Sequence, residues 1–312
     1  MRRLLLTVPV LLGISFVTFA LLAFAPGNYV SLALSSGISS PQVLERVRDQ
    51  LRLDEPWFLR FVHYLGDVLR GDLGQSIVVG QPVAGQIMTA LPNTLILAFS
   101  ALVFAVVVSL IAGGLAGARP NTLTDYVASA LSVIGVALPS FWLGLMLILL
   151  FSLKLQWLPL SGGGTASLSG GAWAFVSALI LPTVALGSEL TALLTRLTRN
   201  ALLDVMGEDY IRTARAKGVA PARVLYRHAL RNAALPLITT AGLQFGALLG
   251  GAVIVETIFS WPGMGLLTLN AIQQRDLPMI QGSVLVFAAL FVLTVLVTDL
   301  LYALVDPRIQ YE

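Results

Sequence analysis

Six long apolar runs with few or no charged side chains constrain this chain more than any other feature. They cover residues 4–25, 93–118, 127–153, 172–195, 233–258 and 281–305. A helix needs about 20 mostly apolar residues to cross the hydrocarbon core of a bilayer. Only 11% of the residues are charged, whereas an ordinary soluble domain has about 25%. The sequence therefore predicts an all-α membrane protein with six transmembrane helices and excludes a water-soluble globule.

The first run has a second interpretation, a cleaved signal peptide. Ala23-Phe24-Ala25 matches the small-x-small pattern that precedes a cleavage site. The run is longer than the 7 to 15 apolar residues that are usual in a signal peptide, and Pro26 would directly follow the cut. We therefore favour a retained helix.

Basic residues are concentrated between the fourth and fifth runs. This loop has three acidic residues and eight basic ones, namely Arg196, Arg199, Arg212, Arg215, Lys217, Arg223, Arg227 and Arg231. The two shorter loops of the opposite side carry only Lys154 and Arg275. Because short basic loops stay in the cytoplasm, we expect this loop and both termini to be cytoplasmic. Trp157, Trp173 and Trp261 then fall at outer ends, where we expect them in the headgroup layer.

The outer segment 26–92 is too long for a simple connection. Its apolar spacing predicts helices over 43–51 and 57–69. Pro41 and Pro56 stand near their starts, where a missing N–H costs nothing. We expect a helical cap on the outer membrane face. Packing against the neighbouring spans and docking of a partner protein both remain open as its role.

The cytoplasmic segment 196–233 has the pattern of two short helices. The first is expected over 202–217, where Glu208 precedes Arg212 at the favourable i,i+4 spacing. Gly218 can supply a left-handed turn at its C-terminal end. Pro221 suits the start of a second helix that runs to about Arg231. The sequence predicts a two-helix elbow outside the membrane.

Small side chains line part of the first elbow helix. Thr213, Ala214 and Ala216 would allow the surface of another protein to approach the helix backbone closely. The alternative is a loop that serves topology alone. Topology needs a few basic residues, not about 30 residues patterned as two helices, so we favour a docking role.

The same residues carry a resemblance to a known family. The run 208–218, Glu-Asp-Tyr-Ile-Arg-Thr-Ala-Arg-Ala-Lys-Gly, continues through His-Ala-Leu-Arg-Asn at 228–232 to Leu235-Pro236. It resembles the cytoplasmic coupling loop of permease subunits of ATP-binding cassette (ABC) importers. Arg212 and Thr213 replace the Glu-Ala that usually begins the motif. This departure is similar to the version found in the dipeptide, oligopeptide and nickel branch.

Further motifs of that branch follow in order along nearly the whole chain. They are Leu53-Asp54-Glu55-Pro56, Gly71-Asp72-Leu73-Gly74, Pro92-Asn93-Thr94, Phe259-Ser260-Trp261-Pro262-Gly263 and Asp306-Pro307-Arg308. One motif departs from the branch, because Pro26-Gly27-Asn28-Tyr29 stands where Pro-Gly-Asp-Pro is frequent. The resemblance implies a single permease domain over 1–312, with the outer loop 26–92 and the coupling loop 196–233 as its parts.

The resemblance also implies a location in a bacterial inner membrane, and it implies several partners. These are a second homologous permease, two cytoplasmic ATPase subunits, an extracytoplasmic substrate-binding protein and membrane lipids. In the family the helix before the glycine of the motif sits in a groove of the ATPase and transmits its closure to the spans. The resemblance assigns ATPase coupling here to Glu208, Asp209, Tyr210, Arg212, Thr213, Ala214, Arg215, Lys217 and Gly218.

The chain carries no motif for its own energy supply or catalysis. Its only lysines, Lys154 and Lys217, do not follow glycine, so it lacks a phosphate-binding P-loop. We expect no cofactor on this chain, with ATP and Mg²⁺ on the partner ATPases. Without cysteine and with only His63 and His228, it offers no metal or nucleophile motif, and we expect no enzymatic activity. The pI of 9.4 reflects 19 basic and 16 acidic residues rather than a nucleic-acid surface.

Three acids within the apolar runs leave an alternative open. Glu189 lies in the fourth run, Glu256 near the outer end of the fifth and Asp299 near the inner end of the sixth. Intramembrane acids are typical of ion-driven transporters, so a proton-coupled secondary transporter is the rival class. A place on the translocation path and a structural hydrogen bond are both open for these residues. The expected cargo is a di- or oligopeptide, with a nickel chelate or glutathione as the alternative.

Pairs of small residues indicate how the helices meet. Gly113 with Gly117 and Gly246 with Gly250 have the small-xxx-small spacing of close helix contacts in lipid. We favour packing within this chain over contact with a second permease.

Overall fold

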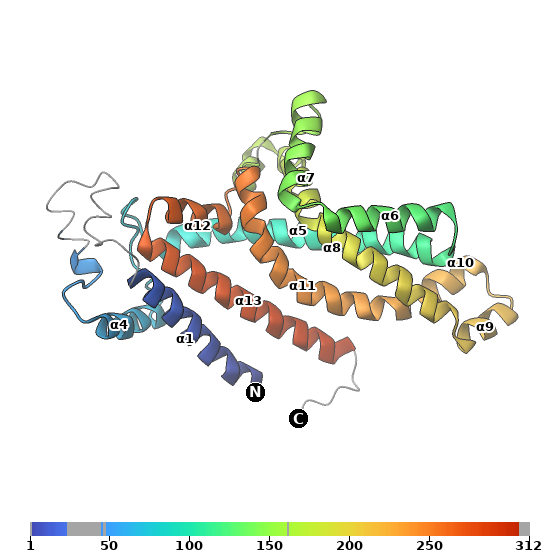
Figure 1. The fold of residues 1–312 in the computed structure, drawn as a ribbon, viewed down its shortest axis with the longest axis horizontal. Coiled ribbons are helices and arrows are strands. Elements are labelled where there is room, and N and C mark those ends of the chain that lie inside the picture. Colours follow the sequence, from blue (N-terminus) through green and yellow to red (C-terminus); the bar gives the residue numbers. More distant parts are fainter. Residues whose placement is uncertain (1, 24–44, 46–47, 161, 306–312) are drawn as a thin grey trace. The chain divides into compact units, whose positions relative to one another are not determined.

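The computed structural model describes residues 2–23, 45, 48–160 and 162–305. The described residues are almost entirely helical, with a single isolated bridge between Gln75 and Pro82 (Figure 1). The chain divides into two compact units. Unit 1 comprises residues 1–94 and 262–293, and unit 2 comprises residues 95–261 and 294–312. Two long helices, α5 (Val83–Ala118) and α13 (Leu277–Val305), run through both.

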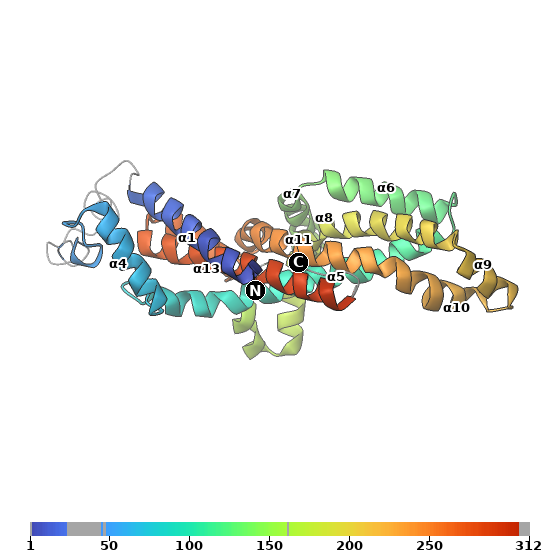
Figure 2. The same cartoon turned by 90° about the horizontal axis from the view of Figure 1, so that it is seen from below.

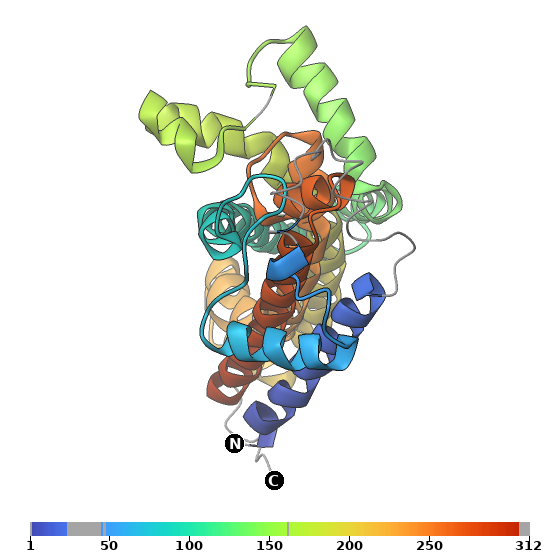
Figure 3. The same ribbon diagram turned by 90° about the vertical axis from the view of Figure 1, so that its left-hand side faces the viewer.

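Unit 1 contains α1 (Arg2–Ala23), α4 (Trp57–Leu69) and α12 (Met264–Gln273), with the adjoining parts of α5 and α13. Figure 3 shows α4 running across α1. Phe61 of α4 stacks edge-on against Phe16 of α1, with ring centroids 5.4 Å apart. The core of this unit is formed by Val83, Ile87, Ala90, Met264, Ala271 and Met279. The helix predicted over 57–69 is confirmed. Of the helix predicted over 43–51, residues 43, 44, 46 and 47 lie outside the described residues, and the described residues 45 and 48–50 are helical.

Buried polar contacts hold the connections of unit 1. Asn93 Nδ2 donates to the Pro262 carbonyl at 2.9 Å, and the Met264 N–H donates to Thr94 Oγ1 at 2.8 Å. Asp276, which is 3% exposed, accepts hydrogen bonds from Ser76 Oγ and from the Ile77 N–H at 3.2 Å. The Pro-Asn-Thr and Trp-Pro-Gly motifs of the sequence therefore meet here and fix the start of α12.

Unit 2 surrounds the long helices α8 (Ala172–Met206) and α11 (Leu230–Ile258). The preceding elements are α6 (Leu123–Ala137), α7 (Ser140–Leu147), the π-helical η1 (Ile148–Lys154) and the 3₁₀ helix η2 (Gly164–Gly170). Between α8 and α11 lie α9 (Asp209–Ala216), α10 (Pro221–Arg223) and the π-helical η3 (Val224–Ala229). Figure 2 shows α9 and α10 beyond the ends of α8 and α11.

The third apolar run was predicted to form one span over 127–153, but it does not form a straight helix. It forms α6 and the pair α7 and η1, which are bent by 106° relative to each other (Figure 1). Leu138 has an extended backbone, with φ −86° and ψ 120°, at the break. Pro139 causes this, because its ring disfavours the helical conformation of the preceding residue.

The described helices give four candidate membrane spans, or five if the bent pair is counted as one. The four are α5, α8, residues 236–258 of α11 and residues 277–298 of α13. The first predicted run corresponds to α1, whose described apolar part, 7–22, is shorter than a span. A helical multi-span protein is therefore confirmed. The count of six stays a prediction.

Close helix packing within unit 2 confirms the role expected for one glycine pair. A methyl group at Gly113 would lie 2.6 Å from the Thr195 carbonyl of α8, and one at Gly117 would lie 3.0 Å from the Arg199 carbonyl. These contacts bring α5 and α8 together backbone to backbone. At Gly250 a methyl group would meet nothing within 4 Å, so that position needs no glycine for packing inside the chain.

The interfacial position predicted for Trp261 is wrong. Trp157 and Trp173 are exposed, as expected of headgroup residues, but Trp261 is fully buried. Its ring lies against Gly162, where an added methyl carbon would be only 2.3 Å away, and near Phe175. Trp261 was placed at the interface because it lies at the end of a span. The sequence did not show that Gly162, which has no side chain, leaves space for its indole ring.

Candidate functional site

The segment between α8 and α11 forms a compact elbow, which we define as residues 207–229. The predicted single helix over 202–217 is wrong, because α8 continues to Met206 and a separate helix α9 begins at Asp209. Gly207 ends α8, and Glu208 precedes α9 with an extended backbone (φ −70°, ψ 149°). Two residues thus redirect the chain without interrupting its hydrogen bonding, since the Glu208 N–H donates to the Val205 carbonyl at 3.1 Å.

An apolar cluster holds the elbow together. We call it the elbow core, and it comprises Leu202, Ile211, Ala214, Val224, Ala229 and Ala233. Ile211 is completely buried, and burial of an isoleucine side chain contributes roughly 1.5–3 kcal/mol. Ala214 is only 9% exposed and faces this core. The small side chain of Ala214 therefore serves internal packing and is not presented to a partner, unlike the sequence expectation.

The turn after α9 has the geometry of a Schellman motif. Gly218 has φ +73°, which confirms the left-handed conformation predicted for it. The Gly218 N–H donates to the Arg215 carbonyl at 2.9 Å, and the Val219 N–H donates to the Ala214 carbonyl at 3.2 Å. These are the two bonds that define the motif, and glycine is favoured there because it has no Cβ. The turn fixes the direction in which the chain leaves α9.

The outer face of α9 is polar and open. The exposed residues of α9 and its flanks are Glu208, Asp209, Tyr210, Arg212, Thr213, Arg215, Ala216, Lys217 and Gly218. Arg212 pairs with Asp209 at 3.1 Å, three residues earlier, rather than with Glu208 as the sequence suggested. Glu208 is excluded from that pair because it precedes the helix. The face therefore offers both charge signs and a tyrosine to an approaching surface.

The second helix of the elbow was predicted to end near Arg231, and this prediction is wrong. Pro221 begins α10, and helical structure continues through η3 into α11 without a break. Asn232 Nδ2 donates to Tyr210 Oη at 2.8 Å and so ties α11 to α9. Because α9 is bonded to the start of a long apolar helix, movement of the elbow would be passed on to that helix.

Sequence reasoning missed an ion pair that joins two other helices of unit 2. Arg199 of α8 contacts both carboxylate oxygens of Asp125 in α6, with Nη2 to Oδ2 at 2.8 Å. The Asp125 side chain is 3% exposed and also accepts from the Asn121 N–H at 2.9 Å. Asp125 is an acid just after a short loop, and Arg199 one of eight basic loop residues. The sequence pattern gave no indication that Asp125 and Arg199 form a pair.

Two of the predicted intramembrane acids, Glu256 and Glu189, have different surroundings. Glu256 of α11 is fully buried, and its carbonyl accepts the Trp261 N–H at 2.8 Å. Glu189 of α8 is exposed to a cavity of about 170 Å³ within unit 2. The cavity is otherwise mostly apolar, and its polar residues besides Glu189 are Ser140 and Gln244. Sequence reasoning named neither of these two, because they are single polar residues in apolar runs.

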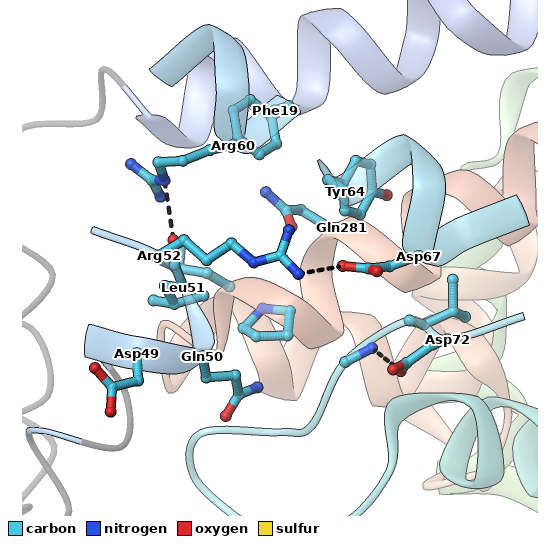
Figure 4. A pocket seen from close by; sticks show the side chains of 14 residues that line it. Phe19, Asp49, Gln50, Leu51, Arg52, Arg60, Tyr64, Asp67, Asp72 and Gln281 are labelled. Atoms are coloured by element: carbon cyan, nitrogen blue, oxygen red, sulfur yellow. Dashed lines mark hydrogen bonds and ion pairs between the residues drawn. The ribbon is translucent and has the colours of Figure 1, made fainter. Parts of the chain in front are cut away.

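A second cavity, of about 320 Å³, lies in unit 1 (Figure 4). Arg52 pairs with Asp67 across it at 3.4 Å, and Arg60 Nε donates to the Leu51 carbonyl at 2.9 Å. Burial raises the pKa of Tyr64 to about 12, so its phenol stays protonated even at pH values where an exposed tyrosine ionises. Among the described residues, no cluster of three or more His, Asp or Glu side chains could hold a metal ion.

Comparison with protein families covers nearly the whole chain. Residues 105–311 match the family described as binding-protein-dependent transport system inner membrane component, and residues 1–98 match the N-terminal part of such components. The resemblance drawn from the coupling-loop motif is therefore confirmed by an independent comparison of the full sequence.

Three relatives are named for the solutes that they transport. The di/tripeptide transport system permease of Pseudomonas aeruginosa is 40% identical, over 100% of this chain and 98% of its own. The oligopeptide transport system permease of Bacillus subtilis is 42% identical, over 99% of this chain and 98% of its own. The glutathione transport system permease of Escherichia coli K12 is 40% identical, over 100% and 98%.

Among solved structures, the chain is similar to an inward-facing form of the MetNI methionine ABC transporter. The TM-score is 0.55 at 20% identity, and the match covers 70% of this chain and 96% of that one. A second crystal form of the same transporter gives a TM-score of 0.56. At this identity the likeness shows a shared fold.

Proposed function

Because this chain belongs to the family of binding-protein-dependent transport system inner membrane components, we propose that it is the permease subunit of an ATP-driven importer of di- or oligopeptides. Two relatives named for di/tripeptide and oligopeptide transport support this cargo. The relative named for glutathione supports a second candidate, which is itself a modified tripeptide. Neither proposal gives the chain a catalytic role.

The proposal rests on the structure of the elbow. The apolar side of α9 packs in the elbow core, while its polar side is exposed. Ile211 and Ala214 anchor α9 to the elbow core, so the helix holds its shape without a partner. We propose that its exposed residues, from Glu208 to Gly218, dock into a separate ATPase subunit that carries ATP and Mg²⁺. Docking movement would reach α11 through the hydrogen bond between Tyr210 and Asn232.

The remaining assembly is proposed on family grounds. We propose six spans in one permease domain, with both termini and the elbow in the cytoplasm. A second permease would complete the translocation path, two ATPases would power it, and an extracytoplasmic binding protein would deliver the peptide. The eight basic residues between the fourth and fifth apolar runs support this orientation.

The source of energy separates this proposal from a proton-coupled transporter. The test is peptide uptake by the complete complex in proteoliposomes, measured with a protonophore and, separately, with ATP removed. We expect uptake to survive collapse of the proton gradient and to stop without ATP. Uptake that follows the proton gradient and ignores ATP would contradict the proposal.

Coupling through the elbow has its own test, with Gly218→Val as the variant. Valine disfavours φ +73°, so the Schellman turn should distort and α9 should be misplaced on the ATPase. We expect ATP hydrolysis to continue while uptake falls at least about tenfold. Gly207→Ala is the matched control, because Gly207 has φ −82° and tolerates a side chain. Normal uptake by Gly218→Val would overturn the coupling assignment.

A further inference from the structure

The cavity beside Glu189 holds a carboxylate within the apolar part of α8. Glu189 lies 6 residues before the end of the fourth apolar run at residue 195, after which α8 continues with Arg196 and Arg199. At 1.5 Å per residue, this places it about 9 Å inside the apolar part of the helix. A charged group in a membrane span costs about 2.5–3.5 kcal/mol on insertion scales, and such residues mark substrate or ion pathways.

Four helices line this cavity, and three of them each supply one polar side chain. Ser140 comes from α7, Glu189 from α8 and Gln244 from α11. Within the described part of the chain, none of the three side chains has a hydrogen-bond or ion-pair partner. By contrast, the neighbouring hydroxyls of Ser188 and Thr191 are satisfied by carbonyls of α8 itself. The three groups at the cavity are thus set apart from the other polar groups of the helix.

The lining has one negative charge and no basic residue. A carboxylate accepts hydrogen bonds only, and the amide and hydroxyl each add an acceptor oxygen. The rest of the lining is apolar, including Val136, Leu186, Leu190 and Leu193. A group that matches this surface is a small cation with several N–H donors, attached to a short apolar chain.

We propose that Glu189, with Ser140 and Gln244, binds the amino-terminal ammonium group of the transported peptide. The inference rests on the proposed function and adds a specificity determinant on the path. An ammonium group has three donors for the three acceptor side chains, and a charge-assisted bond to a carboxylate is the strongest kind available. The cavity of about 170 Å³ accommodates one terminal residue of a peptide rather than its whole length.

The close packing around the cavity supports a preformed site. Gly135 of α6 lies against α8 so tightly that an added methyl carbon would be 2.9 Å from Ala192 Cβ. Gly251 of α11 lines the cavity, and a methyl carbon there would make an ordinary contact with Leu186 Cδ1 at 3.4 Å. The close approach of α6 at Gly135 thus fixes the part of α8 that carries Glu189.

The test measures equilibrium binding to the complete transporter, purified without its binding protein and placed in nanodiscs. The probes are Ala-Ala and N-acetyl-Ala-Ala, which differ in the ammonium group. The discs contain phosphatidylglycerol and phosphatidylcholine, so that no phosphatidylethanolamine supplies a competing primary ammonium. Wild type is compared with Glu189→Gln, Glu189→Asp and the control Thr191→Val, whose hydroxyl bonds within α8 and does not line the cavity.

We expect wild type and Thr191→Val to bind Ala-Ala at least about tenfold more tightly than the acetylated probe, as one charge-assisted hydrogen bond implies. Glu189→Gln should lose this preference, and Glu189→Asp should keep part of it. An unchanged preference in Glu189→Gln would overturn the inference, and so would a wild type that binds neither probe saturably.

Two other sources of a cation give distinct results. If Glu189 paired with a basic residue of a second permease, Glu189→Gln would lower the yield of assembled complex and leave the probe preference unchanged, which overturns the inference. If it held a lipid amine, the variant would change only the phosphatidylethanolamine retained from the native membrane, and this result would overturn the inference as well. Failure of the proposed function would show separately, as a wild-type complex without ATP-dependent uptake of free peptide.

Discussion

The helices α4 and α9 are both short, amphipathic and outside the long apolar helices, but their apolar sides are covered differently. In α9, Ile211 and Ala214 are buried in the elbow core. In α4 no residue is buried. Its exposed apolar side chains are Trp57, Phe58, Leu59, Val62 and Leu69. One side of α4 packs on α1, where the rings of Trp57, Phe61 and Tyr64 meet those of Phe16 and Phe19.

This difference shows that the same sequence pattern serves two purposes. The packing of α9 is complete within the chain, so its remaining face is polar and suits recognition of a soluble protein. The packing of α4 is incomplete, because large exposed apolar side chains need a lipid surface or another protein to cover them. We infer that α9 is a docking element of fixed shape and that α4 lies in the membrane interface.

The largest expected effect comes from placing a charge in the elbow core. Ile211→Asp buries a carboxylate without a partner, which costs several kcal/mol, so α9 should detach from the core. We expect at least a tenfold loss of ATPase subunits that copurify with the permease. Leu59→Asp is the control, because Leu59 of α4 is exposed, and it should leave copurification unchanged. Equal losses in both variants would remove the distinction between the helices.

A smaller effect is expected at the ion pair between Asp125 and Arg199. Asp125→Asn leaves Arg199 with a neutral partner at a site where the carboxylate was almost fully buried. We expect a loss of about 1–3 kcal/mol, seen as a lower thermal midpoint of the solubilised complex. The variant should leave the packing of α4 unchanged, because Asp125 and Arg199 belong to the other unit. No change in the midpoint would mean that α6 is held to α8 by apolar packing alone.

The membrane contact of α4 can be measured with a fluorophore, since the chain has no native cysteine. In Val62→Cys labelled with bimane, brominated lipids should quench emission by about half. The same label at Thr213→Cys on α9 should be quenched little, because that face is proposed to meet water or the ATPase. Strong quenching at Thr213 and none at Val62 would reverse the comparison.

The smallest effect is expected at the exposed pair of α9. Asp209 and Arg212 are largely open to solvent, and such pairs contribute roughly 0–1 kcal/mol. Asp209→Asn should therefore shift the thermal midpoint by less than Asp125→Asn does. Any large effect of Asp209→Asn would have to appear in ATPase binding, since its role is proposed to lie in that contact. A large loss of stability would show that α9 depends on its polar face.

The sequence predicted those parts of the fold that depend on local chemistry. The apolar runs located the long helices, because span length and hydropathy are local properties. Gly218 was assigned its left-handed turn correctly, because only a glycine is free to adopt it without cost. The family was identified from the order of short motifs.

Features that depend on contacts between distant residues were not predictable. The pairing of Asp125 with Arg199 and the burial of Trp261 beside Gly162 join residues 74 and 99 positions apart. Ala214 was assigned to a partner surface, whereas α9 turns it toward the elbow core. The bend at Pro139 was the exception, because the residue itself was visible and its effect on Leu138 was overlooked.

Contact between the elbow and the ATPase is tested most directly by a crosslink. Thr213→Cys and Val62→Cys are introduced separately into the cysteine-free chain, and each complex is treated with a short thiol-to-amine crosslinker. We predict a permease–ATPase product for Thr213→Cys, altered by addition of ATP, and none for Val62→Cys. An ATPase product from Val62→Cys, or its absence from Thr213→Cys in an active complex, would contradict the assignment of α9 as the docking element.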